Sequence, residues 1–200
     1  MIRAIFLDVD GTLISFSTHE IPASALRALA QAHERGVRLF IATGRAANDL
    51  GPLEGILYDG VVSLNGARCV ANDGRVVSLH PIPRADFERA LALSEEQGFA
   101  MGLELEEGVF VNRVTPDVER VAHMVAHPVP EQTDLRELFG RVECCQLCFY
   151  FDAETQRRVM AELPTLAASR WCPIFADVNV AGIDKATGME EFMRLSLIHI

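Results

Sequence analysis

The 200-residue sequence is poor in positive charge. It contains 18 Lys and Arg residues against 28 Asp and Glu residues, which gives a formal net charge of -10 at pH 7. A surface of this sign repels the phosphate backbone of nucleic acids and anionic membrane surfaces. We therefore expect neither a nucleic acid nor a membrane as a partner.

The sequence also lacks long hydrophobic runs. No stretch reaches eighteen consecutive apolar residues, so no membrane-spanning helix is predicted. The first pair of closely spaced carboxylates begins at residue 8 and leaves no room for a signal peptide, which predicts a cytoplasmic protein. The composition, 50% hydrophobic and 23% charged, is that of an ordinary globular chain of one or two domains. Nothing in the sequence indicates an oligomeric state.

Cysteine is scarce, and the odd number of five fits a reducing compartment. Three of the five, Cys144, Cys145 and Cys148, are crowded together, but the strand predicted at residues 142–151 would place Cys148 on the face opposite Cys145. A pair split across a strand cannot chelate one metal ion, and no second pair is present. We therefore expect the cysteines to have a structural role.

What the sequence does contain is an apolar stretch, residues 2–7, that leads into two carboxylates. Asp8 and Asp10 are followed at once by Gly11 and Thr12. The consecutive apolar residues Ile5, Phe6 and Leu7, with little polar alternation, predict a strand that is buried on both faces. Because side chains alternate along an extended backbone, both carboxylates should enter one pocket at the carboxyl end of this strand. The alternative is that two acids and a glycine simply form a turn.

The residues DVDGT resemble the first motif, DxDGT, of the haloacid dehalogenase superfamily in its phosphatase branch. The resemblance implies an α/β fold with a doubly wound parallel, Rossmann-like core. It also implies that Asp8 is the nucleophile that takes up a phosphoryl group and that Asp10 is the general acid and base, with Gly11 and Thr12 as support. A carboxylate approaches a phosphate dianion only with a cation between them, so Mg²⁺ is the expected cofactor, with Asp8 and Asp10 among its ligands.

A second apolar strand is predicted at residues 37–42, and it ends in Thr43, Gly44 and Arg45. The run ATGR resembles the second motif of the Cof-type hydrolases, subfamily IIB of the same superfamily. A hydroxyl and free N–H groups at a strand-to-helix junction suit phosphate, so Thr43 and Gly44 are predicted to bind it. Thr43 could instead be only a helix cap. Arg45 could steer the substrate or pair with a core carboxylate.

Two further residues belong to motifs of the same subgroup. Asn65 follows a predicted strand, residues 60–64, in a turn that resembles the subgroup's NGA turn, where it could support the site or serve only the turn. Lys185 lies in a stretch that resembles the third motif, in which a lysine opens a helix. An ammonium there would neutralise the nucleophile and the phosphoryl oxygens, so Lys185 is predicted to bind phosphate. A lysine at a helix start is otherwise an ordinary solvated charge.

The pattern of hydrophobic residues divides the chain, because core-like strands give way to amphipathic segments from about residue 83. We assign residues 1–82 to the first part of the core, residues 83–176 to an inserted α/β cap domain, and residues 177–194 to a return segment of the core. The Cof-type branch carries a cap of this position and size, which covers the site and shapes substrate choice.

The end of the sequence departs from the family pattern. The fourth motif, which supplies further magnesium ligands, is absent, so we expect a C-terminally truncated chain with an incomplete core. Residues 195–200, LSLIHI, resemble the translation of a transposon adapter used in sequencing libraries, which predicts a non-native tail.

Together the motifs predict a Mg²⁺-dependent phosphatase that hydrolyses a small phosphorylated metabolite, of sugar phosphate type, through an aspartyl-phosphate. One alternative is a catalytically impaired fragment that lacks the fourth motif. Another is a phospho-accepting receiver domain of a signalling protein, which also gathers acids, a threonine and a lysine but has no insert of this size. The sequence does not disclose the substrate.

Overall fold

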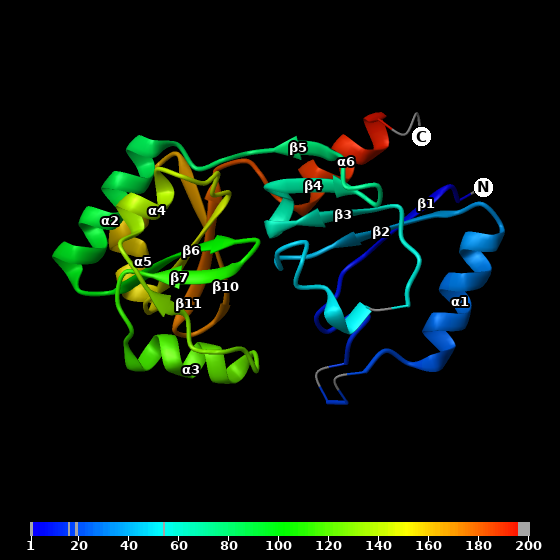
Figure 1. The fold of residues 1–200 in the computed structure, drawn as a ribbon, viewed down its shortest axis with the longest axis horizontal. Helices are drawn as coiled ribbons and strands as arrows, with labels where there is room; N and C mark the ends of the chain where they lie inside the picture. The colour runs from blue at the N-terminus through cyan, green and yellow to red at the C-terminus, as the bar shows by residue number, and fades with distance from the viewer. Residues whose placement is uncertain (1, 16, 19, 54, 196–200) are drawn as a thin grey trace. The chain divides into compact units, whose positions relative to one another are not determined.

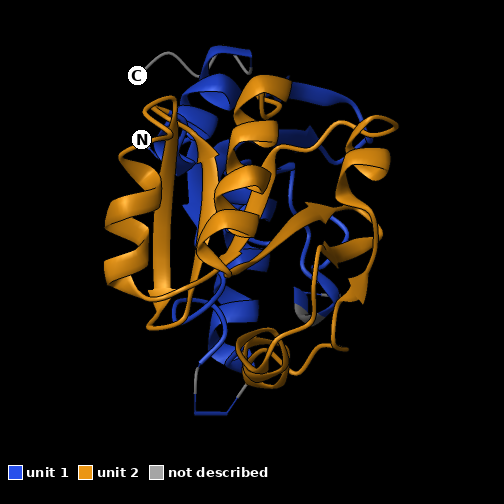
Figure 2. Cartoon of the chain, turned by 90° about the vertical axis from the view of Figure 1, so that its left-hand side faces the viewer, with its two compact units in different colours: residues 1–79, 183–200 blue, residues 80–182 orange. Residues whose placement is uncertain are grey.

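The structure is a computed structural model that describes residues 2–15, 17–18, 20–53 and 55–195. The chain divides into two compact units, residues 1–79 with 183–200, and residues 80–182 (Figures 1 and 2). The second boundary lies beyond the position expected from the sequence, because Phe175–Val180 is a strand that pairs with two others of the inserted unit. Within the predicted tail, residues 195–200, only Leu195 is described, and it is the last residue of a helix.

The first unit is built on a five-stranded sheet in the order β1-β2-β3-β4-β5 (Figure 1). Its strands are Ala4–Leu7, Arg38–Ala42, Gly60–Ser63, Arg68–Ala71 and Val76–Leu79. β1, β2 and β3 are parallel, whereas β4 and β5 form an antiparallel hairpin at the edge. The predicted Rossmann-like core is therefore confirmed, with a hairpin added to its parallel part.

Both faces of this sheet are covered, which explains why β2 is apolar from Leu39 to Ala42. Leu39 and Ile41 pack in one hydrophobic cluster with Leu29 of α1 (Ala23–Glu34). Phe40, between them in the sequence, belongs to a different cluster with Phe192 of α6 (Lys185–Leu195). Alternate side chains thus enter two cores, because successive residues of a strand face opposite ways. Two short 3-10 helices, η1 (Gly51–Leu53) and η2 (Leu64–Gly66), lie in the connections.

The second unit contains a six-stranded sheet in the order β10-β11-β9-β6-β7-β8. Its strands are Ala100–Leu105 (β6), Gly108–Val111 (β7), Glu131–Gln132 (β8), Gln146–Tyr150 (β9), Leu166–Cys172 (β10) and Phe175–Val180 (β11). Its helices are Arg84–Gln97 (α2), Pro116–Met124 (α3), Leu135–Phe139 (α4) and Ala153–Met160 (α5). The helices α2, α4 and α5 lie together beside this sheet (Figure 1). Their side chains share one core with β6 and β9, whereas α3 packs in a separate cluster that contains Cys148 and Tyr150.

β10 is not among the strands predicted from the sequence. This strand contains Ala167, Ala168 and Ser169, which have low intrinsic strand propensity, and it lies at the edge of its sheet. Its hydrogen-bonded partner β11 is therefore what stabilises it in extended form.

The cysteines, which all lie in the described part of the chain, form no disulfide bond and are buried, in agreement with a structural role. Along β9, Leu147 and Phe149 enter the core formed with α2, α4 and α5, and Cys148 lies in the other cluster. Burial raises the pKa of the Cys144 thiol to about 12. Among the described residues, no helix combines the length and the apolar composition needed to cross a bilayer.

Candidate active site

Asp8 and Asp10 lie directly after β1, where the chain turns back on itself. The amide of Ile14 donates to the carbonyl of Val9, and the amide of Gly11 donates to the carbonyl of Ile14. Gly11 has φ 79°, a left-handed conformation that glycine adopts without strain. Val9 is buried, whereas the side chains of Asp8 and Asp10 are 39% and 44% exposed. The turn therefore presents both carboxylates at the carboxyl end of β1.

The carboxylate of Asp8 is held at both oxygens. Lys185 Nζ lies 2.6 Å from Oδ1, and the Thr12 hydroxyl donates to Oδ2 at 3.1 Å. Lys185 is the first residue of α6 and is 177 positions away from Asp8 in the sequence. It is also the only lysine among the 18 Lys and Arg residues. The structure thus brings together three residues that the sequence analysis had assigned to the site.

The carboxylate of Asp10 forms a bidentate pair with Arg45. Arg45 Nε donates to Oδ2 at 3.0 Å and Nη2 donates to Oδ1 at 2.8 Å. Hydrogen bonds from Arg45 hold the pKa of the Asp10 carboxyl below its ordinary value, against the opposing effect of burial. Arg45 also donates to Asp49 at 3.2 Å. Of the two roles left open for Arg45, the structure shows pairing with a carboxylate, and that carboxylate belongs to the site.

Asp49 is a residue that the sequence analysis missed. Its spacing of four from Arg45 suits a pair on a helix. However, the helix expected after Thr43 is not formed: residues 43–50 are irregular and the short η1 follows. The sequence from Gly51 continues with Pro52, which disfavours a helix that would run into this position. The strand-to-helix junction predicted at Thr43 is therefore wrong.

Thr43 and Gly44 come directly after β2. The register pairs Leu7 with Ile41, so the end of β2 lies beside the residues that follow β1. Thr43 is 1% exposed, and its hydroxyl accepts a hydrogen bond from the backbone amide of Arg45 at 3.1 Å. Thr43 thereby shapes the loop that carries Arg45 to Asp10, but it caps no helix.

Asn65 is the central residue of η2, at the end of β3. Its backbone amide donates to the carbonyl of Thr43 at 3.0 Å. Asn65 adopts φ 54°, a left-handed conformation that asparagine tolerates better than most residues. The contact with Thr43 gives Asn65 a role in the turn and joins that turn to the loop after β2.

The pairing of Asp10 with Arg45 predicts how stability depends on pH. A carboxyl whose pKa is lowered by folding stabilises the folded state above its unfolded value, here near 3.8, and this stabilisation is lost as the pH falls through the folded value. We expect Arg45→Gln to reduce the free energy of unfolding by about 0.5–1 kcal/mol at pH 7, because the pair is partly screened by solvent. The deficit should be smaller at pH 3 than at pH 7.

Urea unfolding of the wild type and of Arg45→Gln at pH 7 and pH 3 checks this expectation. Arg75→Gln, which removes an arginine from the β4–β5 turn, is the matched control for loss of one positive charge. A deficit for Arg45→Gln that is the same at both pH values would contradict the role assigned to the pair.

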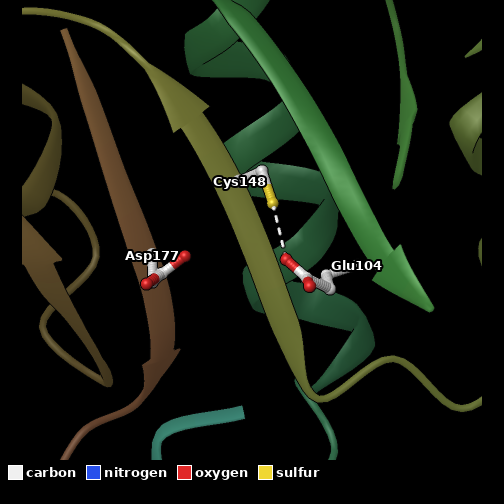
Figure 3. Close-up of side chains that lie close together, drawn as sticks. All are labelled: Glu104, Cys148 and Asp177. Carbon is white, nitrogen blue, oxygen red and sulfur yellow. Dashed lines mark hydrogen bonds between the residues drawn. The ribbon is translucent and has the colours of Figure 1, made fainter. Parts of the chain in front are cut away.

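A second group of polar side chains lies in the inserted unit, on β6, β9 and β11 (Figure 3). Ligand-type atoms of Glu104, Cys148 and Asp177 all lie within 4.8 Å of one another. Gln146 Nε2 donates to Glu104 at 3.3 Å and to Asp177 at 3.2 Å, and the Cys148 thiol donates to Glu104 at 3.4 Å. Burial raises the pKa of Cys148 well above its ordinary value, so it stays a protonated donor. These bonds link three neighbouring strands.

A Rossmann-like sheet with an inserted α/β unit, and a DxD motif at the carboxyl end of its first strand, define a haloacid dehalogenase-like hydrolase. The chain belongs to this family, whose profile matches residues 5–198.

Relatives narrow the class to phosphatases. The chain is 26% identical over 198 residues to the putative phosphatase YkrA of Bacillus subtilis (strain 168). The aligned region covers 96% of this chain and 74% of the relative. It resembles the structure of BT1666, a haloalkanoate dehalogenase superfamily phosphatase from Bacteroides thetaiotaomicron, at 52% identity and a TM-score of 0.95, over 100% of this chain and 75% of the other. It resembles the structure of the subclass IIB sugar phosphatase BT4131 at 31% identity and a TM-score of 0.88, over 98% of this chain and 77% of the other.

These comparisons confirm the predicted resemblance to Cof-type phosphatases of subfamily IIB. The protein is a phosphatase of the haloacid dehalogenase superfamily. The alternative of a receiver domain is wrong, because the family profile covers the chain from the first strand to beyond Lys185.

Proposed function

We propose that the protein is a Mg²⁺-dependent phosphatase that hydrolyses a small phosphorylated metabolite, of the sugar phosphate type, through an aspartyl-phosphate. The observation that carries this proposal is the contact of Lys185 with Asp8 beside the Asp10–Arg45 pair. These groups supply a nucleophile, a proton carrier and two cations at one end of a sheet. The similarity to a sugar phosphatase supports the substrate class.

In the first step, a carboxylate oxygen of Asp8 bonds to phosphorus and the bond from phosphorus to the ester oxygen breaks. The departing oxygen takes a proton from Asp10. Lys185 offsets the negative charge that the phosphoryl oxygens bring to the site, and Thr12 restricts rotation of the nucleophile. Local cations are needed here because the net charge of the protein, -10, repels a phosphorylated substrate.

In the second step, Asp10 accepts a proton from water, and the oxygen of that water bonds to phosphorus. The acyl-phosphate bond breaks, which releases inorganic phosphate and restores Asp8. The bidentate pair with Arg45 favours the ionised carboxylate of Asp10. Asp10 can therefore carry a proton only when Arg45 no longer pairs with it. The phosphoryl dianion of the substrate is the partner that competes with Asp10 for Arg45.

Mg²⁺ fits the donor set of this site. A magnesium site usually takes one or two carboxylates and completes its shell with water and phosphate oxygens, and Asp8 and Asp10 offer two partly exposed carboxylates. When bound, the ion would neutralise charge between Asp8 and the phosphate dianion. We further propose that residues 80–182 form the cap that excludes bulk water and selects the substrate. The buried cysteines, which are not joined in disulfide bonds in the described structure, support a cytoplasmic protein.

Hydrolysis of p-nitrophenyl phosphate, measured with Mg²⁺ and with EDTA, tests the proposed function. We expect turnover that requires Mg²⁺, and a relative such as BT4131 serves as the positive control for the assay. Turnover in EDTA equal to that in Mg²⁺ would contradict the metal dependence. No turnover by this chain, with turnover by the relative, would contradict the proposal and favour the alternative of a catalytically impaired chain.

A further inference from the structure

A strained turn lies between the loop after β2 and the start of α6. It consists of Leu64, Asn65 and Gly66, and we refer to it as the 64–66 turn. We infer that the 64–66 turn positions two groups of the site at once, the Thr43–Arg45 loop and the ammonium of Lys185. This inference rests on the proposed function of those groups.

All three residues of the turn have left-handed backbones. Leu64 has φ 48°, Asn65 has φ 54° and Gly66 has φ 99°. Leucine rarely adopts this conformation, and Leu64 is also buried, at 5% exposure. Such strain persists only when the surrounding contacts over-determine the backbone, and it concentrates at functional sites. The contacts that hold this turn run in two directions.

The first set of contacts reaches the loop after β2. The amide of Leu64 donates to the carbonyl of Arg45, and the amide of Asn65 donates to the carbonyl of Thr43, each at 3.0 Å. The side chain of Asn65 also lies against Gly44, because a Cβ atom on Gly44 would be 3.1 Å from Asn65 Oδ1. The turn therefore holds both ends of the loop that offers phosphate-binding groups and carries Arg45 to Asp10.

The second set of contacts reaches the start of α6. A Cβ atom on Gly66 would overlap the carbonyl group of Asp184 and would lie 3.2 Å from the amide nitrogen of Lys185. Asp184 is itself held in place as the cap of α6, because its carboxylate accepts a hydrogen bond from the backbone amide of Thr187 at 2.9 Å. Only glycine at position 66 allows this approach of the two backbones.

The close packing between the 64–66 turn and α6 continues one turn further into the helix. A Cβ atom on Gly188 would lie 3.3 Å from Cα of Gly66 and 2.9 Å from Cys69 Sγ. The amide of Gly188 donates to the carbonyl of Asp184, the group that Gly66 approaches. The first turn of α6 thus packs on the 64–66 turn. The 2.6 Å contact of Lys185 with Asp8 depends on this packing.

Gly66→Ala separates this role from ordinary backbone strain. The added methyl should push the start of α6 and Lys185 away from Asp8. Gly74→Ala, in the β4–β5 turn, is the matched control, because Gly74 has a similar φ of 85° but open space around its Cβ position. We expect kcat for p-nitrophenyl phosphate to fall about 100-fold in Gly66→Ala, as for a misplacement of about 1 Å, and to stay near the wild-type value in Gly74→Ala.

A second readout does not depend on turnover. Because Lys185 is the only lysine, protein labelled with ¹⁵N-lysine gives a single side-chain amine signal. This signal should shift in Gly66→Ala and stay in place in Gly74→Ala. An unshifted signal, or a kcat for Gly66→Ala within threefold of the wild type, would overturn the inference. If the wild type itself shows no turnover, the proposed function fails, while the lysine signal still decides the positioning role.

Asn65→Gly tests the other direction and covers the case in which Gly66→Ala does not fold. Glycine adopts φ 54° without strain, so the turn should persist while the amide over Gly44 is lost. We expect KM for p-nitrophenyl phosphate to rise severalfold, with the Lys185 signal unchanged. Wild-type values of both KM and kcat would overturn the claim that the turn acts on the Thr43–Arg45 loop.

Discussion

Asp8→Asn is expected to lower kcat for p-nitrophenyl phosphate by about 10⁴-fold or more. The amide is the same size as the carboxylate and still accepts a hydrogen bond from Thr12, but it cannot form the bond to phosphorus. Loss of a nucleophile removes nearly all the catalysis that depends on it, and only the effects of binding and charge remain. Steady-state turnover in Mg²⁺ measures the loss.

Two variants make this result specific to the nucleophile. Asp8→Glu keeps the charge but moves the oxygens outward by one methylene, and we expect a loss of about 100-fold from misplacement alone. Asp73→Asn is the neutral control, because Asn can still accept the hydrogen bond that Asp73 receives from the amide of Arg75 in an exposed turn. Residual activity in Asp8→Asn within tenfold of the wild type would exclude Asp8 as the nucleophile.

Lys185→Arg is expected to lower kcat by about 10²–10³-fold although it keeps the positive charge. Every other basic residue of Lys or Arg type in this sequence is arginine, so arginine is well tolerated elsewhere in the fold. The ammonium is a compact point charge 2.6 Å from Asp8, whereas the planar guanidinium is larger and spreads its charge over a fork. Loss of one well-placed donor to a developing anion has an effect of this size.

The single lysine allows a chemical test of the same role. Acetylation of the wild type modifies amines, and Lys185 and the terminal amine are the targets, so activity should fall in parallel with modification of Lys185. Inorganic phosphate should protect the enzyme. Lys185→Arg, treated in the same way, measures what the terminal amine contributes. Full activity in protein that mass spectrometry shows to be acetylated at Lys185 would contradict the assigned role.

The sequence indicated the parts of the site that depend on local chemistry. The apolar strands that end at residues 7 and 42 place Asp8, Asp10 and Thr43 at the carboxyl ends of neighbouring parallel strands, and period-two alternation applies to any such strand. The strand Ala4–Leu7 and the return of the chain at Gly11 needed no long-range information. Lys185 was different, because only its resemblance to a family motif connected it with Asp8.

Other assignments depended on which partner lies nearby in space. As far as the sequence shows, Arg45 could steer the substrate or pair with a core carboxylate. The fold pairs it with Asp10 and with Asp49. Thr43 was expected before a helix that does not form. The strand β10 has little propensity of its own and is extended because β11 pairs with it.

By itself, then, the sequence indicated the family and its fold class through the resemblance of short runs such as DVDGT to family motifs, while periodicity predicted the buried strands. Only the tertiary structure decided which charges pair and where close backbone contact demands glycine. Gly66 shows the reason: nothing near it in the sequence excludes a side chain, and the carbonyl of Asp184 that does so arrives from the other end of the chain. Such constraints arise when separate segments pack, and one segment read alone does not contain them.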